Sequence, residues 1–532
     1  MVLGSPGTDR KAQNSVSVGL AAEALRSGNV IQARQMLNER IAQYPHDADA
    51  LQLLAEVARV QQSIEEATFL LRRAVAADPK PERRIALILH LKRNGGHALA
   101  LAEIEQLPDA VRNSFDLRGI ESSIASVLGM HERQIQLLQA MVREQPSDAN
   151  LWVSLGNALK TVGRTAEAVK ALQRSLRVLP TNGNAWWTLA NFKSFKFTLR
   201  DITQMRASLQ GRLTPEDALH IHFALGKALE DRAEYEQSFR HYDAGNRLRA
   251  AAFHPEHVRV TRTVDAAISA FTPEFFERNK GAGFPADGPI FVVGLHRAGS
   301  TLLEQILASH PLVEGTAELV TMRSISERIA RLSKTSAADA ITSLKPEDFR
   351  AIGEEYIDRT RAFRHTDRPF FVDKLPGNWT QLALIRAALP NARIVDARRH
   401  PMACGFSNFK QNYASGVGYS YSQATIGACY HDYWRFMRHF NAVQPGVVHR
   451  VINEQLIDDP EGEVRRMLEH LGLPFDPACL EFHKTERAIR TPSAEQVRRP
   501  INREGVDYWR HYEPWLGELK QALGPALEHW AD

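Results

Sequence analysis

The sequence predicts an all-α solenoid of short helical repeats, followed by an α/β domain with a central parallel sheet. Three observations support this prediction. In the first half, prolines that close amphipathic segments recur 34 residues apart, at Pro45 and Pro79 and again at Pro146 and Pro180. The segment 277–288 then breaks the pattern with three glycines and a proline, as a linker does. From Pro289 an apolar run, a glycine loop and a helical pattern follow one another, which is typical of a buried strand that leads into a helix.

Bulk properties limit the functional classes. At 532 residues the chain is too long for one core, and its net charge of +4 gives no sign of a general nucleic-acid or membrane surface. No apolar run approaches the roughly 20 residues of a membrane span. The three cysteines are far apart and form no metal-binding spacing, so we expect reduced thiols, no metal site and a cytoplasmic protein. Residues 1–16 are polar and predict a disordered tail.

The proline spacing is the period of the tetratricopeptide repeat. We assign residues 17–276 to an array of such repeats, because one repeat alone cannot bury its apolar face. The copy with the most matching positions carries Trp152, Leu155, Gly156, Leu159, Ala168, Leu172 and Pro180. The array predicts either a groove for an acceptor peptide or a partner protein, or a surface that only packs on the second domain or forms a homodimer. The pattern does not separate these alternatives.

The loop between the expected strand and helix, Gly294 to Gly299, has the spacing G-x4-G. In a Walker A loop the next residues would be lysine and serine or threonine, whereas here they are Ser300 and Thr301. Such a P-loop-like turn keeps its backbone N–H groups and hydroxyls for one phosphate, with Arg297 as the local cation. The alternative is an ordinary strand-to-helix turn.

The wider segment from Pro289 to Pro311 resembles the 5′-phosphosulfate motif of sulfotransferases that use 3′-phosphoadenosine 5′-phosphosulfate (PAPS). Together with the repeats, the chain resembles the bacterial tetratricopeptide-repeat sulfotransferases, which are related to protein-tyrosine sulfotransferases. This resemblance implies a sulfotransferase domain over residues 289–532. It also implies that the phosphate loop is formed by Arg297, Ala298, Gly299, Ser300 and Thr301. The family's loop usually has serine where this chain has Ala298, so one hydroxyl is missing while the backbone N–H remains.

Sulfuryl transfer needs a base for the acceptor hydroxyl and cations for the charge that develops on the leaving phosphate. The family's proposed base is the glutamate eight residues after the histidine of this motif. Counting from His310, that residue is Glu318. The family lysine at the bridging oxygen of the phosphosulfate lies in a short strand that ends Asp-Lys-x-Pro, so Lys374 takes this role together with Arg297. Pairing between Lys374 and its neighbour Asp373 is the structural alternative.

The family holds the nucleotide's 3′-phosphate with an arginine and, eight residues later, a serine. Arg399 and Ser407 match this spacing, and Arg399 fits better than its neighbour Arg398. By the same resemblance, Ser493 provides a further donor to the phosphosulfate.

Two positions depart from the family pattern. A nucleotide-binding tyrosine is Asn453 here, which cannot stack on adenine. A basic residue that precedes a tryptophan in the family is Tyr508 here. Arg499 or Arg503 then becomes the candidate for the missing charge at the 3′-phosphate.

The leading hypothesis is therefore a metal-independent sulfotransferase that uses PAPS and an acceptor hydroxyl, with protein tyrosine the first candidate. A carbohydrate, a lipid and a small phenol remain open as acceptors. The alternative from another class is a non-catalytic nucleotide-binding scaffold that uses the repeat array for partner binding, which the two departures favour. A nucleoside kinase is the third idea, and the missing Walker lysine argues against it.

Overall fold

The computed structural model describes residues 18–192, 194–251, 256–413, 417–485 and 496–532. The expected tail, residues 1–16, and Ser493 lie outside the described residues. The chain divides into two compact units, Met1–Val178 and Leu179–Asp532. The first unit is helical as far as it is described, and the second combines further helices with a five-stranded sheet.

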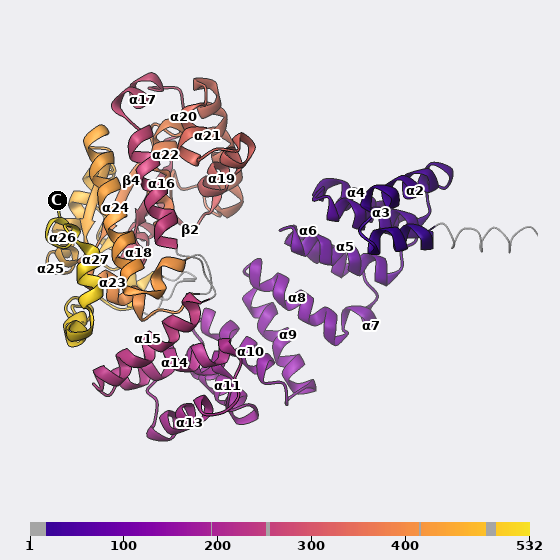
Figure 1. Ribbon diagram of the computed structural model, residues 1–532, viewed down its shortest axis with the longest axis horizontal. Coiled ribbons are helices and arrows are strands. Elements are labelled where there is room, and N and C mark those ends of the chain that lie inside the picture. Colours follow the sequence, from indigo (N-terminus) through magenta and orange to yellow (C-terminus); the bar gives the residue numbers. More distant parts are fainter. Residues whose placement is uncertain (1–17, 193, 252–255, 414–416, 486–495) are drawn as a thin grey trace, which may run out of the picture. The chain divides into compact units, whose positions relative to one another are not determined.

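The first unit consists of helices that pack as consecutive pairs, such as α3 with α4 and α10 with α11 (Figure 1). Gly156 of α10 lies against α11, and a Cβ there would come within 2.8 Å of Leu172. This close approach is why the repeat needs glycine at the helix crossing. The helices are α2 (Val30–Gln43), α3 (Ala48–Val60), α4 (Ile64–Ala77), α5 (Pro81–Arg93), α6 (His97–Glu105), α7 (Asp109–Arg112), α8 (Phe115–Val127), α9 (His131–Glu144), α10 (Ala149–Thr161) and α11 (Thr165–Val178).

The second unit begins with α12 (Gly183–Ala190), α13 (Leu199–Leu209), α14 (Pro215–Glu230), α15 (Tyr235–Ala250), α16 (Glu256–Ala270) and α17 (Pro273–Arg278). α14 and α15 pack as a further repeat-like pair, whereas α16 packs against α24. Phe223 and Tyr242 of this group belong to the same buried cluster as the strand residues Ile290 and Val292. The last repeat helices therefore share their core with the α/β elements. The linker expected at 277–288 lies inside this unit, and its Phe284 N–H donates to the Ala388 carbonyl at 2.8 Å.

The sheet has the strand order β2-β3-β1-β4-β5 and is parallel throughout. Its strands are β1 (Pro289–Gly294), β2 (Val313–Ala317), β3 (Phe370–Lys374), β4 (Arg393–Arg398) and β5 (Val448–Ile452). β1 is buried along its whole length, as its apolar run predicted. β1 lies between β3 and β4. The chain goes from β1 to β2 on one side of the sheet and later to β4 and β5 on the other side, so the loop after β1 lies where the connections diverge. Crevices that bind ligands form at this point of open parallel sheets.

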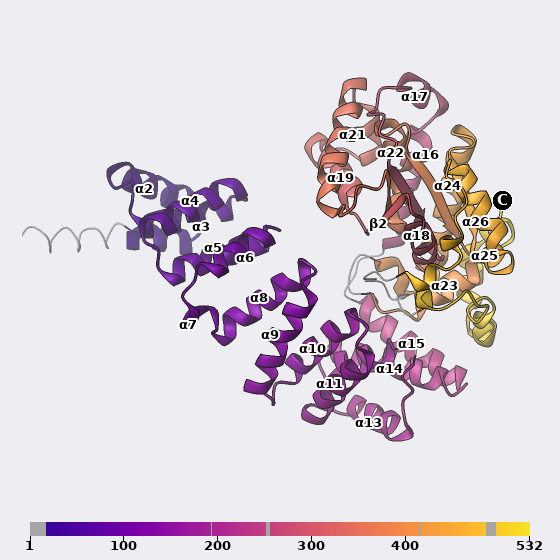
Figure 2. The same ribbon diagram turned by 180° about the vertical axis from the view of Figure 1, so that it is seen from behind.

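Helices cover the sheet, and α16 lies beside α24 (Figures 1 and 2). The α-helices of this part are α18 (Ser300–Ala308), α19 (Thr321–Ser333), α20 (Ala337–Thr342), α21 (Pro346–Thr360), α22 (Leu382–Ala388), α23 (Pro401–Phe409), α24 (Gln423–Val443), α25 (Asn453–Asp458), α26 (Pro460–His470), α27 (Gly517–Leu523) and α28 (Ala526–His529). The short 3-10 helices are η1 (Arg361–Phe363), η2 (Pro376–Gln381), η3 (Gly418–Tyr421), η4 (Pro477–Cys479), η5 (Phe482–Lys484), η6 (Gln496–Arg498) and η7 (Tyr508–Trp515). Among the described residues, no helix is both long and apolar enough to span a membrane.

Replacing Gly294 by alanine is expected to destabilise the second unit. The residue has φ +139°, and a Cβ would lie 2.4 Å from the Ala397 carbonyl oxygen in the neighbouring strand. Backbone strain and overpacking together cost about 2–4 kcal/mol. Calorimetry should show a melting temperature lowered by several degrees. Gly377→Ala is the control, because a Cβ at Gly377 meets no atom within 4 Å, and an equal shift in both variants would contradict this explanation.

Candidate active site

Five of the predicted site positions lie at or directly after the carboxyl ends of the parallel strands. Lys374 is the last residue of β3, and the glycine loop follows β1. The residues directly after β2, β4 and β5 are Glu318, Arg399 and Asn453. Since these ends lie at one edge of a parallel sheet, residues spread over more than a hundred positions of sequence meet there.

The glycine loop turns sharply into α18. Arg297 has φ +69° and Gly299 φ +104°, so both adopt the left-handed conformation that aims successive N–H groups to one side. A Cβ on Gly299 would lie 2.8 Å from Asn453 Oδ1. Glycine is therefore required here for two reasons, its backbone conformation and the side chain packed against it. Asn453 takes its place in the site by contact with this loop.

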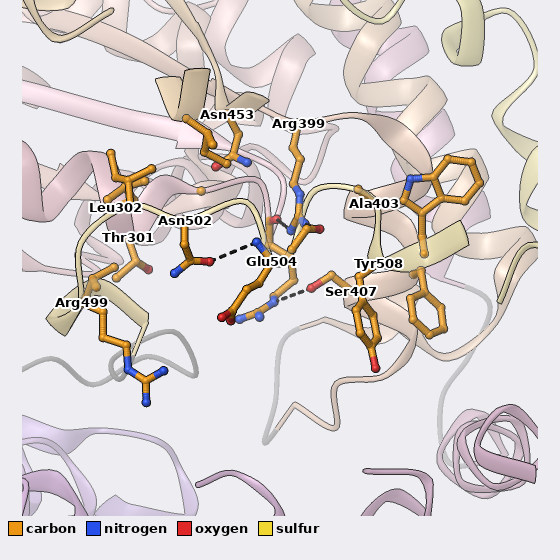
Figure 3. Close-up of a pocket in the computed structure, with 18 of the residues that line it drawn as sticks. Thr301, Leu302, Arg399, Ala403, Ser407, Asn453, Arg499, Asn502, Glu504 and Tyr508 are labelled. Atoms are coloured by element: carbon orange, nitrogen blue, oxygen red, sulfur yellow. Dashed lines mark hydrogen bonds between the residues drawn. The ribbon is translucent and has the colours of Figure 1, made fainter. Parts of the chain in front are cut away.

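The loop, the start of α18 and the segment after β4 line a cavity of about 400 Å³. The expected site residues on its wall are Arg297, Gly299, Ser300, Thr301, Arg399, Ser407 and Asn453. Figure 3 shows Thr301, Arg399, Ser407 and Asn453 around this cavity. Ala298 is buried with 3% of its surface exposed and is absent from the cavity wall.

Arg297, Arg399 and Ser407 form one connected group. Arg297 Nε donates to Ser407 Oγ at 3.0 Å, and Arg399 donates to the Arg297 carbonyl at 3.2 Å. The buried Nε of Arg399 has no hydrogen-bond partner among the described residues. Burial lowers the pKa of the Arg399 guanidinium. A half-buried guanidinium whose buried Nε has no partner in the described part of the chain, on a cavity wall, fits an anionic ligand such as phosphate.

Arg398, the neighbouring arginine, makes contacts inside the protein. Arg398 is buried and pairs with Asp396 at 2.9 Å, and it also donates to the Trp530 carbonyl at 2.8 Å. Its donors are thus directed into the protein. This arrangement agrees with the choice of Arg399 over Arg398 for the ligand.

Lys374 forms an ion pair with Glu318, and its Nζ also lies 3.6 Å from Glu304 Oε2. Lys374 is 1% exposed, whereas the Glu318 side chain is 46% exposed and reaches solvent. Asp373 accepts a hydrogen bond from the Tyr356 hydroxyl at 2.8 Å, and burial raises its pKa to about 7. The alternative pairing of Lys374 with Asp373 is therefore replaced by an ion pair between the two predicted catalytic side chains.

His296, inside the loop, contributes a neutral imidazole. Burial lowers its pKa to about 4, and the nearby charges of Glu318 and Lys374 act on it in opposite directions. Its Nδ1 lies 3.1 Å from the Tyr419 hydroxyl. The residue thus adds polarity to the loop without adding charge at neutral pH.

The two candidates for the missing charge at the 3′-phosphate, Arg499 and Arg503, have different surroundings. Arg499 lines the cavity, whereas Arg503 pairs with Asp458. Sequence reasoning missed Lys410, Lys227 and Glu230, which line the same cavity. The position of Lys410, three residues after Ser407 on a helical pattern, was a signal that could have found it. The residues of α14 carried no such signal, since they belong to the repeats.

Within the described part of the chain, no group of three or more His, Cys, Asp or Glu side chains is placed to hold a metal ion.

A sulfotransferase-family model matches residues 289–477, and a tetratricopeptide-repeat model matches residues 24–89. The chain has a tetratricopeptide-repeat region followed in sequence by a sulfotransferase domain. A bacterial transcriptional activator domain model also matches residues 116–182. All strands of the sheet lie within the sulfotransferase match, as do the cavity-lining residues from Arg297 to Asn453.

Two relatives extend this finding. An uncharacterized protein of Aquifex aeolicus (strain VF5) is 27% identical over 546 residues, covering 98% of this chain and 71% of the relative. A putative protein-tyrosine sulfotransferase of Caenorhabditis briggsae is 25% identical over 226 residues, covering 41% of this chain and 80% of the relative. The similarity to the second protein is thus distant and partial.

Solved structures with similarity include the sulfotransferase domain of the Synechococcus PCC 7002 olefin synthase. It is 20% identical, with coverage of 44% of this chain and 90% of that domain and a TM-score of 0.33. A tetratricopeptide-repeat protein with an unusual peptide-binding site is 16% identical, with coverage of 32% and 88% and a TM-score of 0.29.

Proposed function

We propose that the chain transfers the sulfuryl group of PAPS to an acceptor hydroxyl, with a protein tyrosine as the first candidate acceptor. The observation that carries this proposal is the meeting of two arginines and an ion-paired lysine and glutamate at the ends of neighbouring parallel strands. The arginines suit a nucleotide with two separate phosphates, and the Lys374–Glu318 pair suits a transfer reaction. The distant similarity to a putative protein-tyrosine sulfotransferase supports the acceptor class.

In this proposal the phosphate loop and Arg297 bind the 5′-phosphosulfate, while Arg399 and Ser407 bind the 3′-phosphate. The fit rests on the unused Nε of Arg399 and on the loop's left-handed residues. Ser493 remains a proposed donor to the phosphosulfate and lies outside the described residues. With both phosphates held, the sulfur is placed at the edge of the sheet where Lys374 ends β3.

The reaction follows from these positions. The acceptor oxygen forms a bond to sulfur as the bond between sulfur and the bridging phosphate oxygen breaks. Glu318 accepts the proton of the hydroxyl, and Lys374 neutralises the charge that develops on the phosphate oxygen. The products are the sulfate ester and adenosine 3′,5′-bisphosphate. Because Glu318 and Lys374 neutralise each other in the free protein, substrate binding has to separate them so that each is free for its task.

Incubation of the full chain with 35S-labelled PAPS and tyrosine-containing proteins tests the proposal. We expect label in protein, released as tyrosine sulfate on hydrolysis. Label in carbohydrate, lipid or a small phenol would keep the reaction and change the acceptor. Tight binding of adenosine 3′,5′-bisphosphate with no transfer to any acceptor would replace the enzyme by a nucleotide-binding scaffold. Binding of ATP with Mg²⁺ in place of PAPS would favour a kinase.

A further inference from the structure

The last repeat helices are bonded directly to the segment that holds Ser407. Asn246 of α15 donates to the carbonyl of Phe409, the final residue of α23, at 2.7 Å. Ser238 of the same helix shares a hydrogen bond of 2.9 Å with the Tyr512 hydroxyl of η7. These contacts are buried and join elements that lie far apart in the sequence. The end of α23 is therefore positioned by a repeat helix.

Glu230, the last residue of α14, is the central group of this contact. It is 8% exposed, and its carboxylate lies 3.0 and 3.2 Å from Lys410 Nζ. The hydroxyls of Tyr242 and Tyr512 also donate to it, at 3.2 and 3.3 Å. A buried carboxylate with several donors is held in one place, and it holds the lysine ammonium in turn.

Lys410 caps the C-terminus of α23 and lies about one helical turn after Ser407, so the two residues are on the same side of this helix end. It lines the same cavity as Arg297 and Arg399. Its Nζ lies 4.6 Å from the ring centroid of Tyr508, the residue that replaces the basic residue expected from the resemblance. The ammonium therefore stands next to the position where a charge is missing.

Burial lowers the pKa of Lys410, and the Glu230 carboxylate opposes this effect. An ammonium that has lost most of its water interacts more strongly with a phosphate than an exposed one does. The cavity wall also contains Lys227, which pairs with Asp231 on its own helix at 2.5 Å. The control is therefore Lys280, an exposed lysine outside the cavity wall that pairs with Glu277 at 3.6 Å.

We propose that Lys410, held by Glu230 of the last repeat, binds the nucleotide's 3′-phosphate in place of the basic residue missing at Tyr508. This inference rests on the proposed function. The final helical repeat, α14 and α15, then forms part of the nucleotide site. This role agrees with the buried core that these helices share with the sheet. Lys410 would then determine the preference for nucleotides that carry a 3′-phosphate.

The experiment measures the Kd of adenosine 3′,5′-bisphosphate and of adenosine 5′-monophosphate by calorimetry on the full chain. Removal of a charge-assisted contact costs about 1.5–3 kcal/mol, so Lys410→Met should raise the Kd of the bisphosphate about 10-fold or more. The Kd of the monophosphate should change less than about threefold. Lys410→Arg should recover part of the loss, and Lys280→Met should behave as the wild type.

Since Lys410→Met leaves the buried Glu230 without its cation, the double variant Lys410→Met/Glu230→Gln guards against a folding effect. It should lose the same preference for the bisphosphate. An unchanged preference in Lys410→Met and in the double variant, an equal loss for the two nucleotides, or the same loss in Lys280→Met would overturn the assignment. If the wild type binds no bisphosphate at all, the proposed function fails and this inference fails with it, whereas retained bisphosphate binding in Lys410→Met removes only the inference.

Discussion

Lys374→Met is expected to lower the rate of sulfuryl transfer by about 10²–10³-fold, because the variant loses the donor at the oxygen where charge develops. The Kd of adenosine 3′,5′-bisphosphate should change little, since Arg399 and the phosphate loop remain. Single-turnover transfer of labelled sulfate, together with calorimetric binding, separates the two effects. Lys374→Arg keeps a cation and should retain more activity than the methionine variant.

The burial of Lys374 requires a control for folding. The side chain is 1% exposed, and its Nζ lies 3.6 Å from the buried carboxylate of Glu304. The methionine variant removes this cation from beside that carboxylate, which can destabilise the site. Lys374→Met/Glu304→Gln removes this conflict. If the double variant folds, binds the bisphosphate and transfers sulfate at the wild-type rate, Lys374 has no catalytic role.

Glu318→Gln is expected to lower the transfer rate by about 10²–10⁴-fold, the usual contribution of a positioned base. Glutamine keeps the size of the side chain but accepts no proton. Nucleotide affinity should remain, because Glu318 follows β2 and is absent from the cavity wall.

The matched control for this experiment is Glu327→Gln. Glu327 is a solvent-exposed glutamate on α19 that pairs with Arg323 at 2.8 Å. It should leave the rate unchanged. The other glutamate near the motif, Glu314, accepts from the backbone N–H of Thr366 at 3.1 Å and is 5% exposed, so its contacts are structural. Wild-type transfer by Glu318→Gln would show that another group takes the proton.

The linear pattern of the chain was enough to predict the strand, loop and helix around Gly294–Thr301. Local reasons explain this success. Four apolar residues precede the loop, glycines occur where φ is positive, and a helical pattern follows directly. The spacing of Arg399 and Ser407 likewise lies within one strand-to-helix turn. Their positions beside the loop required only that their strands be neighbours in a parallel sheet.

Lys410 and Glu230 show where prediction from the sequence stops. The two residues are 180 positions apart and belong to different regions of the pattern, a repeat helix and the end of α23. Nothing in the local sequence of α14 distinguishes Glu230 from a solvated carboxylate at the end of a helix. Glu230 is buried because Tyr242, Tyr512 and Lys410, from three other parts of the fold, contact its carboxylate.

By itself, the sequence determined the repeat period, the α/β character of the second half and the residues that end its strands, because each of these depends on local periodicity and short motifs. Only the tertiary structure decided that Lys374 pairs with Glu318 rather than with Asp373, and that the last repeat shares a core with the sheet. These are contacts between distant segments. Whether they form depends on which side chains become neighbours when the helices and strands pack. A buried charge is stable only with a partner, and the fold decides which partner is near it.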